Sequence, residues 1–194
     1  MGWFSNKSAS KDNRDRVGAE IIRVVSTTLL GPEAFRAEAE IVARELQPGD
    51  IDVIPEFFHN PPTMPASLEK AYGGLGAWLS VCQFACFEIL FNLGEDAMPI
   101  LRKVAFGEYD WTQGNAIEVL CRLAAQGVER DQIISEFRQR IPAMRIEALE
   151  YAAGPLVEQA ENDSHLDTFI KSLGIPEFSK AIDERRNAAA AQNF

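Results

Sequence analysis

The chain is poor in the residue types that most often carry out catalysis. Its 194 residues include two histidines, His59 in a proline-rich stretch and His165 at an expected helix start. A catalytic site needs a nucleophile with a base, paired carboxylates in a cleft or a set of metal ligands. No phosphate-binding glycine-rich loop and no Gly-x-Ser-x-Gly motif is present. The sequence therefore predicts a protein that is not an enzyme and needs no cofactor.

Cysteine is also scarce, with only Cys82, Cys86 and Cys121. The first two are four residues apart, a spacing that could place two metal ligands on one helix face, but no second ligand pair follows. All three lie within apolar helical pattern, which favours buried, reduced thiols. We expect no metal site and a cytoplasmic location.

Strand patterns and a secretory signal are missing as well. Apolar residues recur at helical intervals from Val17 onward, and the alternation of period two that is typical of strands is not found. Residues 1–16 are polar, without the apolar core of a signal peptide. We predict a disordered leader over 1–16 and a single all-α domain of about nine or ten helices over 17–190.

Glycine and proline divide this domain into helices. Pro32 is expected to begin the second helix, and Asp50 to be the N-cap of a short third one. Gly154-Pro155 is expected to end a helix, and 187–194 to form a frayed tail. Further helices are predicted over residues 95–106, 113–125, 129–139 and 156–172.

Residues 74–93 form the one long apolar run, with Glu88 as its only charge. Its length approaches that of a membrane span, and a membrane-associated scaffold is therefore one alternative. Polar residues interrupt the run, and a charge inside lipid is costly. We expect a buried helix in the middle of the fold and no membrane span.

The net charge is −10, and the acids gather in two regions. Residues 33–69 hold eight acids against two arginines, and residues 147–167 hold six acids with no lysine or arginine. These regions would repel a phosphate backbone, so nucleic-acid binding is not expected. An acidic surface suits a basic protein partner, although it can also serve only to keep a protein soluble.

One short phrase occurs three times at nearly constant spacing. Phe87-Glu88-Ile89-Leu90, Ile117-Glu118-Val119-Leu120 and Ile146-Glu147-Ala148-Leu149 begin at positions 87, 117 and 146, and are thus 30 and 29 residues apart. Such a period indicates stacked helical units. We expect the leucine of each phrase to be buried in an equivalent position and its glutamate to face solvent.

One stretch resembles a HEAT repeat. It starts with Met98-Pro99-Ile100-Leu101, has Asp110 in the turn and continues into an apolar, Ala-rich second helix. Arg145 stands where the inward-facing arginine of that family usually lies. Gln113-Gly114 departs from the family pattern, so the family's Asp–Arg ladder cannot run through this repeat.

The resemblance covers about residues 33–172, with 17–30 and 176–194 as caps. It implies an α-α superhelix of stacked antiparallel helix pairs and, usually, a protein-binding role. It implies no activity.

Two surfaces are candidates for binding a partner. In the turn 107–112, aromatic residues are flanked by acids, a combination that often anchors interfaces; alternatively, Trp111 packs back on the next helix. The second is the acidic segment 147–167, and a lesser third is the ridge of Asp50, Asp52 and Glu56 near His59. The predicted partner-binding residues are Glu108, Tyr109, Asp110, Trp111, Glu147, Glu150, Glu158, Glu161 and Asp163.

Together these features predict a cytoplasmic protein-binding module with an acidic surface. An immunity or inhibitor protein that neutralises a basic toxin is one concrete form. A helical-repeat enzyme or lyase-like protein is the alternative from another class.

Overall fold

Helices are the regular secondary structure of the part that the structure describes. The structure, a computed structural model, describes residues 11–192 and has no β-strand in that range. The predicted all-α class is confirmed. These residues divide into two compact units at the boundary between Asn92 and Leu93. The single domain predicted over 17–190 stays a prediction.

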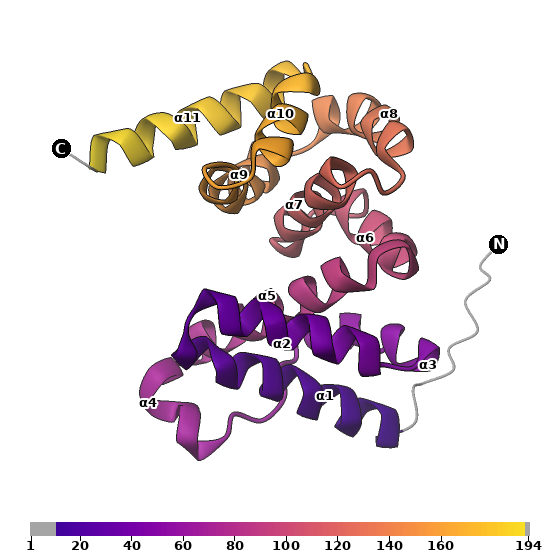
Figure 1. Cartoon of the computed structure of the whole chain (residues 1–194), viewed down its shortest axis with the longest axis vertical. Helices are drawn as coiled ribbons and strands as arrows, with labels where there is room; N and C mark the ends of the chain where they lie inside the picture. Colours follow the sequence, from indigo (N-terminus) through magenta and orange to yellow (C-terminus); the bar gives the residue numbers. More distant parts are fainter. Residues whose placement is uncertain (1–10, 193–194) are drawn as a thin grey trace. The chain divides into compact units, whose positions relative to one another are not determined.

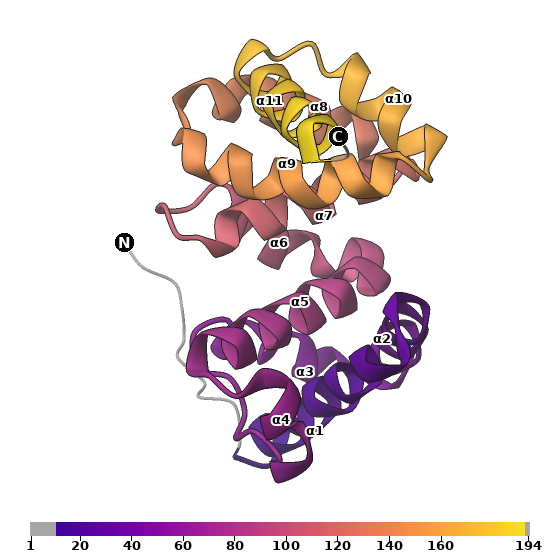
Figure 2. The ribbon, with the colours of Figure 1, turned by 90° about the vertical axis from the view of Figure 1, so that its left-hand side faces the viewer.

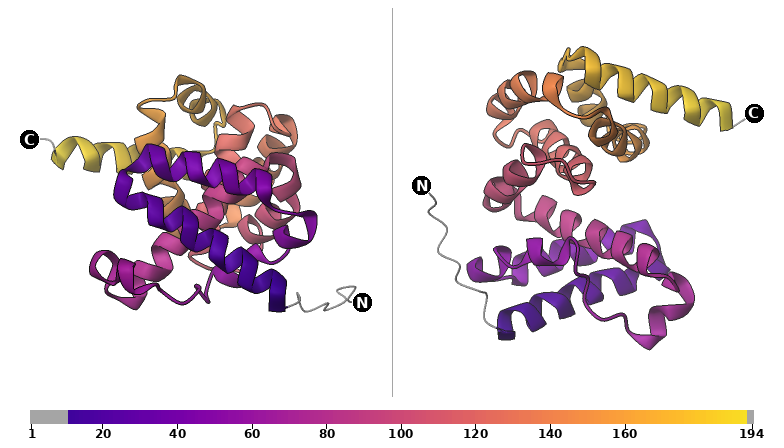
Figure 3. Two further views of the ribbon diagram at one scale, coloured as in Figure 1. Left: turned by 60° about the horizontal axis from the view of Figure 1, so that its bottom comes forward. Right: turned by 180° about the vertical axis from the view of Figure 1, so that it is seen from behind.

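The first unit begins with two helices that lie side by side (Figures 1 and 3). The α1 helix ends in a short 3₁₀ turn, and Gly31, with a φ of 113°, allows the sharp bend before Pro32 begins α2 as predicted. The elements of this unit are α1 (Lys11–Ser26), η1 (Thr27–Leu30), α2 (Pro32–Glu45), α3 (Pro48–Ile51), η2 (Ile54–Phe57), η3 (Ala66–Leu68), α4 (Glu69–Tyr72) and α5 (Leu75–Leu93).

The α5 helix confirms the helix predicted over the long apolar run. The Phe87 ring stacks on Phe58 with 4.8 Å between centroids, and the Trp78 indole N–H donates to the Pro62 carbonyl over 2.7 Å. These contacts attach α5 to the loop 58–65. Phe84, on the same helix, is 51% exposed. One stretch of the described chain, Gly76–Ala105, is long and apolar enough to cross a membrane by length and composition, and 56% of its most apolar part is buried within the protein.

The predicted leader is wrong from Lys11 onward. The α1 helix begins at Lys11, and Arg14 and Arg16 on its first turns form ion pairs with Glu56 and Asp50. These partners are 42 and 34 residues away in sequence, so a local pattern of polar residues gave no sign of them. The rest of the leader, residues 1–10, lies outside the described residues.

In the second unit each helix packs on at least one other helix of the unit (Figures 1 and 2). The α6 helix packs on α7, α7 on α9 and α9 on α11, while α10 contacts both α7 and α9. Its elements are η4 (Gly94–Ala97), α6 (Met98–Ala105), α7 (Thr112–Ala125), α8 (Arg130–Arg140), η5 (Ile141–Ala143), α9 (Ile146–Ala160), α10 (Ser164–Ser172) and α11 (Pro176–Gln192). The helices predicted over 95–106, 113–125 and 129–139 correspond to η4 with α6, to α7 and to α8.

Two predicted helix ends are wrong in this unit. Gly154-Pro155 does not end a helix, because α9 runs through Pro155 to Ala160. A proline inside a helix costs about 3 kcal/mol, and the buried face of α9, which packs on both α7 and α11, offsets that cost. The frayed tail is wrong over 187–192, where α11 continues to Gln192; residues 193–194 lie outside the described residues.

The repeated phrase is buried at its leucine, as expected, but not exposed at every glutamate. Leu90, Leu120 and Leu149 are at most 1% exposed. Glu147 faces solvent, whereas Glu88 and Glu118 are buried. The phrase opens α9 but lies in the interior of α5 and α7. The glutamate of the same sequence phrase is therefore buried in two helices and exposed in the third, because a residue in the first turn of a helix has fewer neighbours.

Candidate functional site

In the acid-rich segment 33–69 of the first unit, five of the eight acids pair with arginines of the same unit. Asp50, expected as an N-cap, is instead the third residue of α3; its Oδ2 accepts the Gln47 N–H at 3.0 Å and its Oδ1 pairs with Arg16. The ridge Asp50–Asp52–Glu56 therefore has two of its three charges neutralised, since Glu56 pairs with Arg14 at 2.6 Å. The other acid pairs in this unit are Arg23 with Glu20, Glu38 and Glu45, and Arg44 with Glu40.

The second unit leaves a row of acids without such partners. We call the acidic face of α9 the set Glu147, Glu150, Glu158 and Glu161, the last being the C-cap of the helix. At 100° per residue these four positions fall within about 80° around the helix axis. All four side chains are exposed, and none forms an ion pair with any residue in the range 11–192. The acid-rich segment predicted from sequence is thus an open acidic surface.

Two of the charges on this face are placed against the stability of the helix. Glu158 and Glu161 lie at the C-terminal end of α9, where the helix dipole is negative, and no basic residue stands in its last turn. They are also three residues apart, as are Glu147 and Glu150, so like charges are neighbours. The Nε of Arg185 in α11 would lie 3.7 Å from a Cβ added at Gly154, between Glu150 and Glu158 along the helix. An arrangement that costs stability is expected where the charges serve another purpose.

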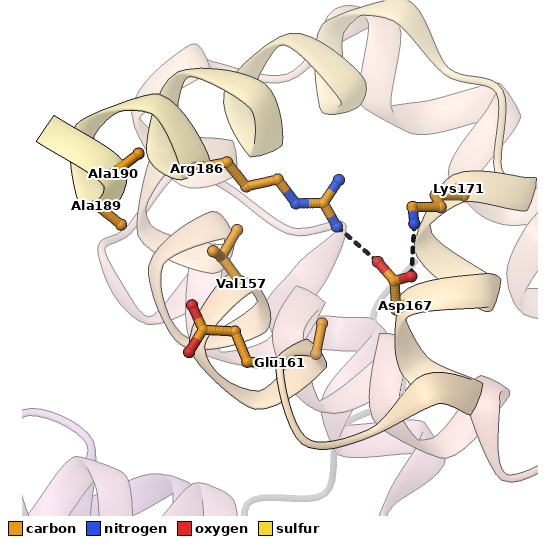
Figure 4. Close-up of a pocket in the computed structure, with 8 residues that line it drawn as sticks. Val157, Glu161, Asp167, Lys171, Arg186, Ala189 and Ala190 are labelled. Carbon is orange, nitrogen blue, oxygen red and sulfur yellow. Dashed lines mark hydrogen bonds and ion pairs between the residues drawn. The ribbon is translucent and has the colours of Figure 1, made fainter. Parts of the chain in front are cut away.

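Beyond the C-terminal end of α9 lies a hollow of about 530 Å³ between α9, α10 and α11 (Figure 4). On one side, the Lys171 ammonium, whose Nζ lies 2.6 Å from Asp167, lowers the pKa of that carboxyl, and Arg186 acts in the same direction from 2.7 Å. Glu161 lines the hollow apart from this cluster, and Ala189 and Ala190 of α11 line it as well (Figure 4). Asp167 is therefore neutralised, and Glu161 is not.

Asp163 has a structural role that occupies one of its oxygens. As the N-cap of α10, its Oδ1 accepts the backbone N–H groups of His165 at 2.9 Å and Leu166 at 3.0 Å. The predicted helix start at this position is confirmed, and His165 is exposed there. The candidate role of Asp163 in partner binding stays a prediction.

The turn 107–112 is held in place by the residues that follow it. The buried carboxamide of Gln113 donates to the carbonyl of Ala105 at 3.0 Å and to that of Gly107 at 3.4 Å. Asp110 accepts the Thr112 N–H at 3.0 Å through Oδ1, which satisfies a free donor at the start of α7. The end of α6 and the start of α7 are thus fastened together, and the turn between them is fixed.

The aromatic side chains of this turn are partly open to solvent. Trp111 is 52% exposed and Tyr109 is 40% exposed, while Glu108 is exposed beside them. The guanidinium of Arg145, the N-cap residue of α9, lies over the Tyr109 ring at 4.7 Å. Arg145 itself is exposed, not inward-facing as the HEAT resemblance implied. Sequence reasoning did not foresee this pair because its members are 36 residues apart.

A smaller hollow of about 240 Å³ opens beside Tyr109. The turn 106–109 and Gln113 form one side, and Arg140, η5 and Arg145 form the other. We call it the Tyr109 hollow. It brings Arg140 and Arg145 next to Tyr109, which is flanked by acids in the sequence.

The thiols and potential metal ligands do not form a reactive site in the described residues. Burial raises the pKa of Cys82 to about 12, and raises the pKa of Cys86 and Cys121 well above the usual value. Each thiol therefore stays protonated at neutral pH. Among residues 11–192, no group of three or more histidine, cysteine, aspartate or glutamate side chains is arranged to hold a metal ion.

Comparison of the chain with family models, with curated proteins and with solved structures gave no match.

Proposed function

We propose that the protein is a cytoplasmic, non-catalytic protein-binding module that recognises a basic partner through the acidic face of α9. The observation that carries the proposal is the contrast between the two acid-rich regions. Five of the eight acids in the segment 33–69 are paired with Arg14, Arg16, Arg23 and Arg44, whereas the four on α9 have no ion-pair partner among the described residues. An unpaired row of carboxylates attracts a cationic surface and speeds its association.

Neighbouring side chains support the same proposal. Tyr151 follows Glu150 on the same side of α9 and is 56% exposed. Trp111 is about equally exposed at the N-cap of α7, the helix against which α9 packs. Large aromatic side chains next to charged ones are typical of the residues that dominate binding energy. Stacked helix pairs of the HEAT type, which the helix order of the second unit resembles, commonly present such faces. A small inhibitor, such as an immunity protein that neutralises a basic toxin, is one form of this function.

The proposal is tested by removing the charge of the face while keeping its shape. The partner is first captured from the native host with the wild-type chain, and its affinity is then measured at several salt concentrations. The test variant carries Glu147→Gln, Glu150→Gln, Glu158→Gln and Glu161→Gln. We expect it to bind at least about tenfold more weakly, and we expect wild-type binding to weaken as salt rises.

A control variant loses the same charge elsewhere in the second unit. It carries Glu95→Gln, Asp96→Asn, Asp131→Asn and Asp183→Asn, four exposed acids outside α9. The control should keep wild-type affinity within about threefold. Equal losses in both variants would show only a response to net charge. Recovery of no basic partner, or binding that is indifferent to salt, would end the proposal.

The stability cost of the acidic face gives a separate prediction. Glu158→Gln removes a negative charge near the C-terminus of α9 and should raise the free energy of unfolding by about 0.3–1 kcal/mol. Glu147→Gln removes one from the first turn, where the dipole favours it, and should lower that free energy by a similar amount. Urea denaturation of both variants measures the two signs. The same sign for both would mean that the dipole does not govern these residues.

A further inference from the structure

We infer that the Tyr109 hollow is a binding site for an oxyanion group, a phosphate monoester or a carboxylate, carried by a larger ligand. The inference starts from Arg140 and Arg145, which both line the hollow. Neither forms an ion pair with a carboxylate of the described residues. The nearest acids in the turn and on α9, Glu108 and Glu147, pair with neither. Two guanidinium groups therefore meet at one hollow with their charge uncompensated.

Most other arginines of the second unit are engaged. Arg102 pairs with Glu129 and Glu136, Arg122 with Glu118 and Arg186 with Asp167. Arg138 and Arg185 are exposed and unpaired as well, but neither lines the Tyr109 hollow. Arg140 and Arg145 are thus two unpaired arginines that line the same hollow.

The stacking of Arg145 on Tyr109 prepares one of these groups for binding. A guanidinium that lies over an aromatic ring, here at 4.7 Å, has its face covered and its orientation restricted. Its N–H groups lie in the plane and remain able to donate. That planar fork matches the two oxygens of a carboxylate or of a phosphate. Because the ring restricts the side chain before binding, less conformational entropy is lost when the anion arrives.

The framework around the hollow is fixed by hydrogen bonds. Gln113 uses its amide N–H groups to hold Ala105 and Gly107, which fixes the side of the hollow that includes Tyr109. On the other side, the Met144 N–H donates to the Ile141 carbonyl at 2.9 Å and closes the η5 turn between the two arginines. The two guanidinium groups are thus presented from a short, ordered connection.

The size and lining of the hollow limit what it can hold. Its volume of about 240 Å³ lies below the usual range for whole small ligands, about 300–1,000 Å³. It suits one end group of a larger molecule. Phe106 and Met144 add apolar surface beside the arginines, which favours an anion attached to an aromatic or other apolar group.

The test uses the full chain and three small probes of similar shape: phenyl phosphate, benzoate and the neutral benzyl alcohol. Binding is measured by titration calorimetry and by the side-chain Nε–Hε signals of the arginines. We expect at least one anion to bind with a Kd of about 1 mM or tighter and to shift the signals of Arg140 and Arg145. Tighter binding of phenyl phosphate identifies a phosphate source, and tighter binding of benzoate a carboxylate source.

Substitutions locate the binding. Arg140→Ala and Arg145→Ala should each weaken binding of the preferred anion by about tenfold or more, because each removes a charged donor. Arg145→Lys should recover only part of this loss, since lysine lacks the planar fork. Arg138→Ala, two residues from Arg140 on the same helix, is the control and should change binding by less than about twofold.

Three results would overturn the inference. They are binding of neither anion, equal binding of the neutral probe, and an equal loss in Arg138→Ala. The acidic face of α9 uses other residues, so each of the two proposals can fail while the other stands.

Discussion

Replacing Gly114 with alanine is expected to lower the free energy of unfolding by about 2 kcal/mol. Gly114 lies in the first turns of α7 where this helix crosses α9. A Cβ at this position would be 2.5 Å from the Cβ of Tyr151 and 2.9 Å from the backbone oxygen of Ala148. Neither atom is the end of a flexible side chain, so the two helices would have to move apart. Overpacking costs about 1–3 kcal/mol, and a clash with backbone falls at the upper end. The better helix propensity of alanine returns at most about 1 kcal/mol.

Gly76→Ala in α5 is the matched control. A Cβ there meets no atom within 4 Å, so only the propensity term acts and stability should rise by about 0.5–1 kcal/mol. Urea denaturation of both variants gives the two free energies. If Gly114→Ala were neutral or stabilising, the close approach of α7 and α9 in this structure would be wrong.

The same crossing positions both candidate sites. It sets the distance between the turn 107–112, which leads into α7, and Arg145, which leads into α9. Tyr151, part of the exposed surface around the acidic face, makes the closest approach to Gly114. A change at Gly114 should therefore also disturb the stacking of Arg145 on Tyr109. The glycine that departs from the HEAT pattern after Asp110 is the residue that permits this arrangement.

The positions of most helices could be predicted because helical periodicity is a local property. The α5 and α7 helices begin within one residue of their predicted starts. Pro155 misled the prediction, because its local effect is to break a helix, and only the packing of α9 on two neighbours outweighs it. Arg14 and Arg16 misled it for the same kind of reason, since their partners are remote in sequence.

The acids show how far charge can be predicted from sequence. The sequence shows that the segment 147–167 is acidic and lacks basic residues, and all of its acids except Asp167 are exposed. What sequence could not show is that five of the eight acids in the equally acidic segment 33–69 pair with arginines of α1 and α2. It also could not show that Arg140 and Arg145 meet beside Tyr109, because that meeting depends on how α8, η5 and α9 return toward the turn after α6.

A second large effect is expected at Glu118, a carboxylate buried between α7 and α9. Its Oε1 accepts from the Arg122 guanidinium at 3.3 Å and from the Gln159 amide at 2.8 Å. The side chains of Glu118 and Arg122 are only 8% and 11% exposed. Their i, i+4 spacing was visible in the sequence, but a glutamate in a repeated phrase was expected to face solvent. In place of an exposed charge, the structure has an ion pair inside the helix packing.

Arg122→Met should therefore lower the free energy of unfolding by about 3–5 kcal/mol, because it leaves the Glu118 charge buried without its cation. The double variant Glu118→Leu with Arg122→Met removes both charges and should recover most of that loss, since apolar residues of similar volume replace a buried pair at little cost.

Arg44→Met is the control. The pair of Arg44 with Glu40 has the same i, i+4 spacing but is exposed, so the loss should be below about 0.5 kcal/mol. Urea denaturation of the wild type and these three variants gives the losses to be compared. If Arg122→Met cost no more than Arg44→Met, solvent would have to reach Glu118, and the close packing of α7 on α9 would be contradicted at a point independent of Gly114.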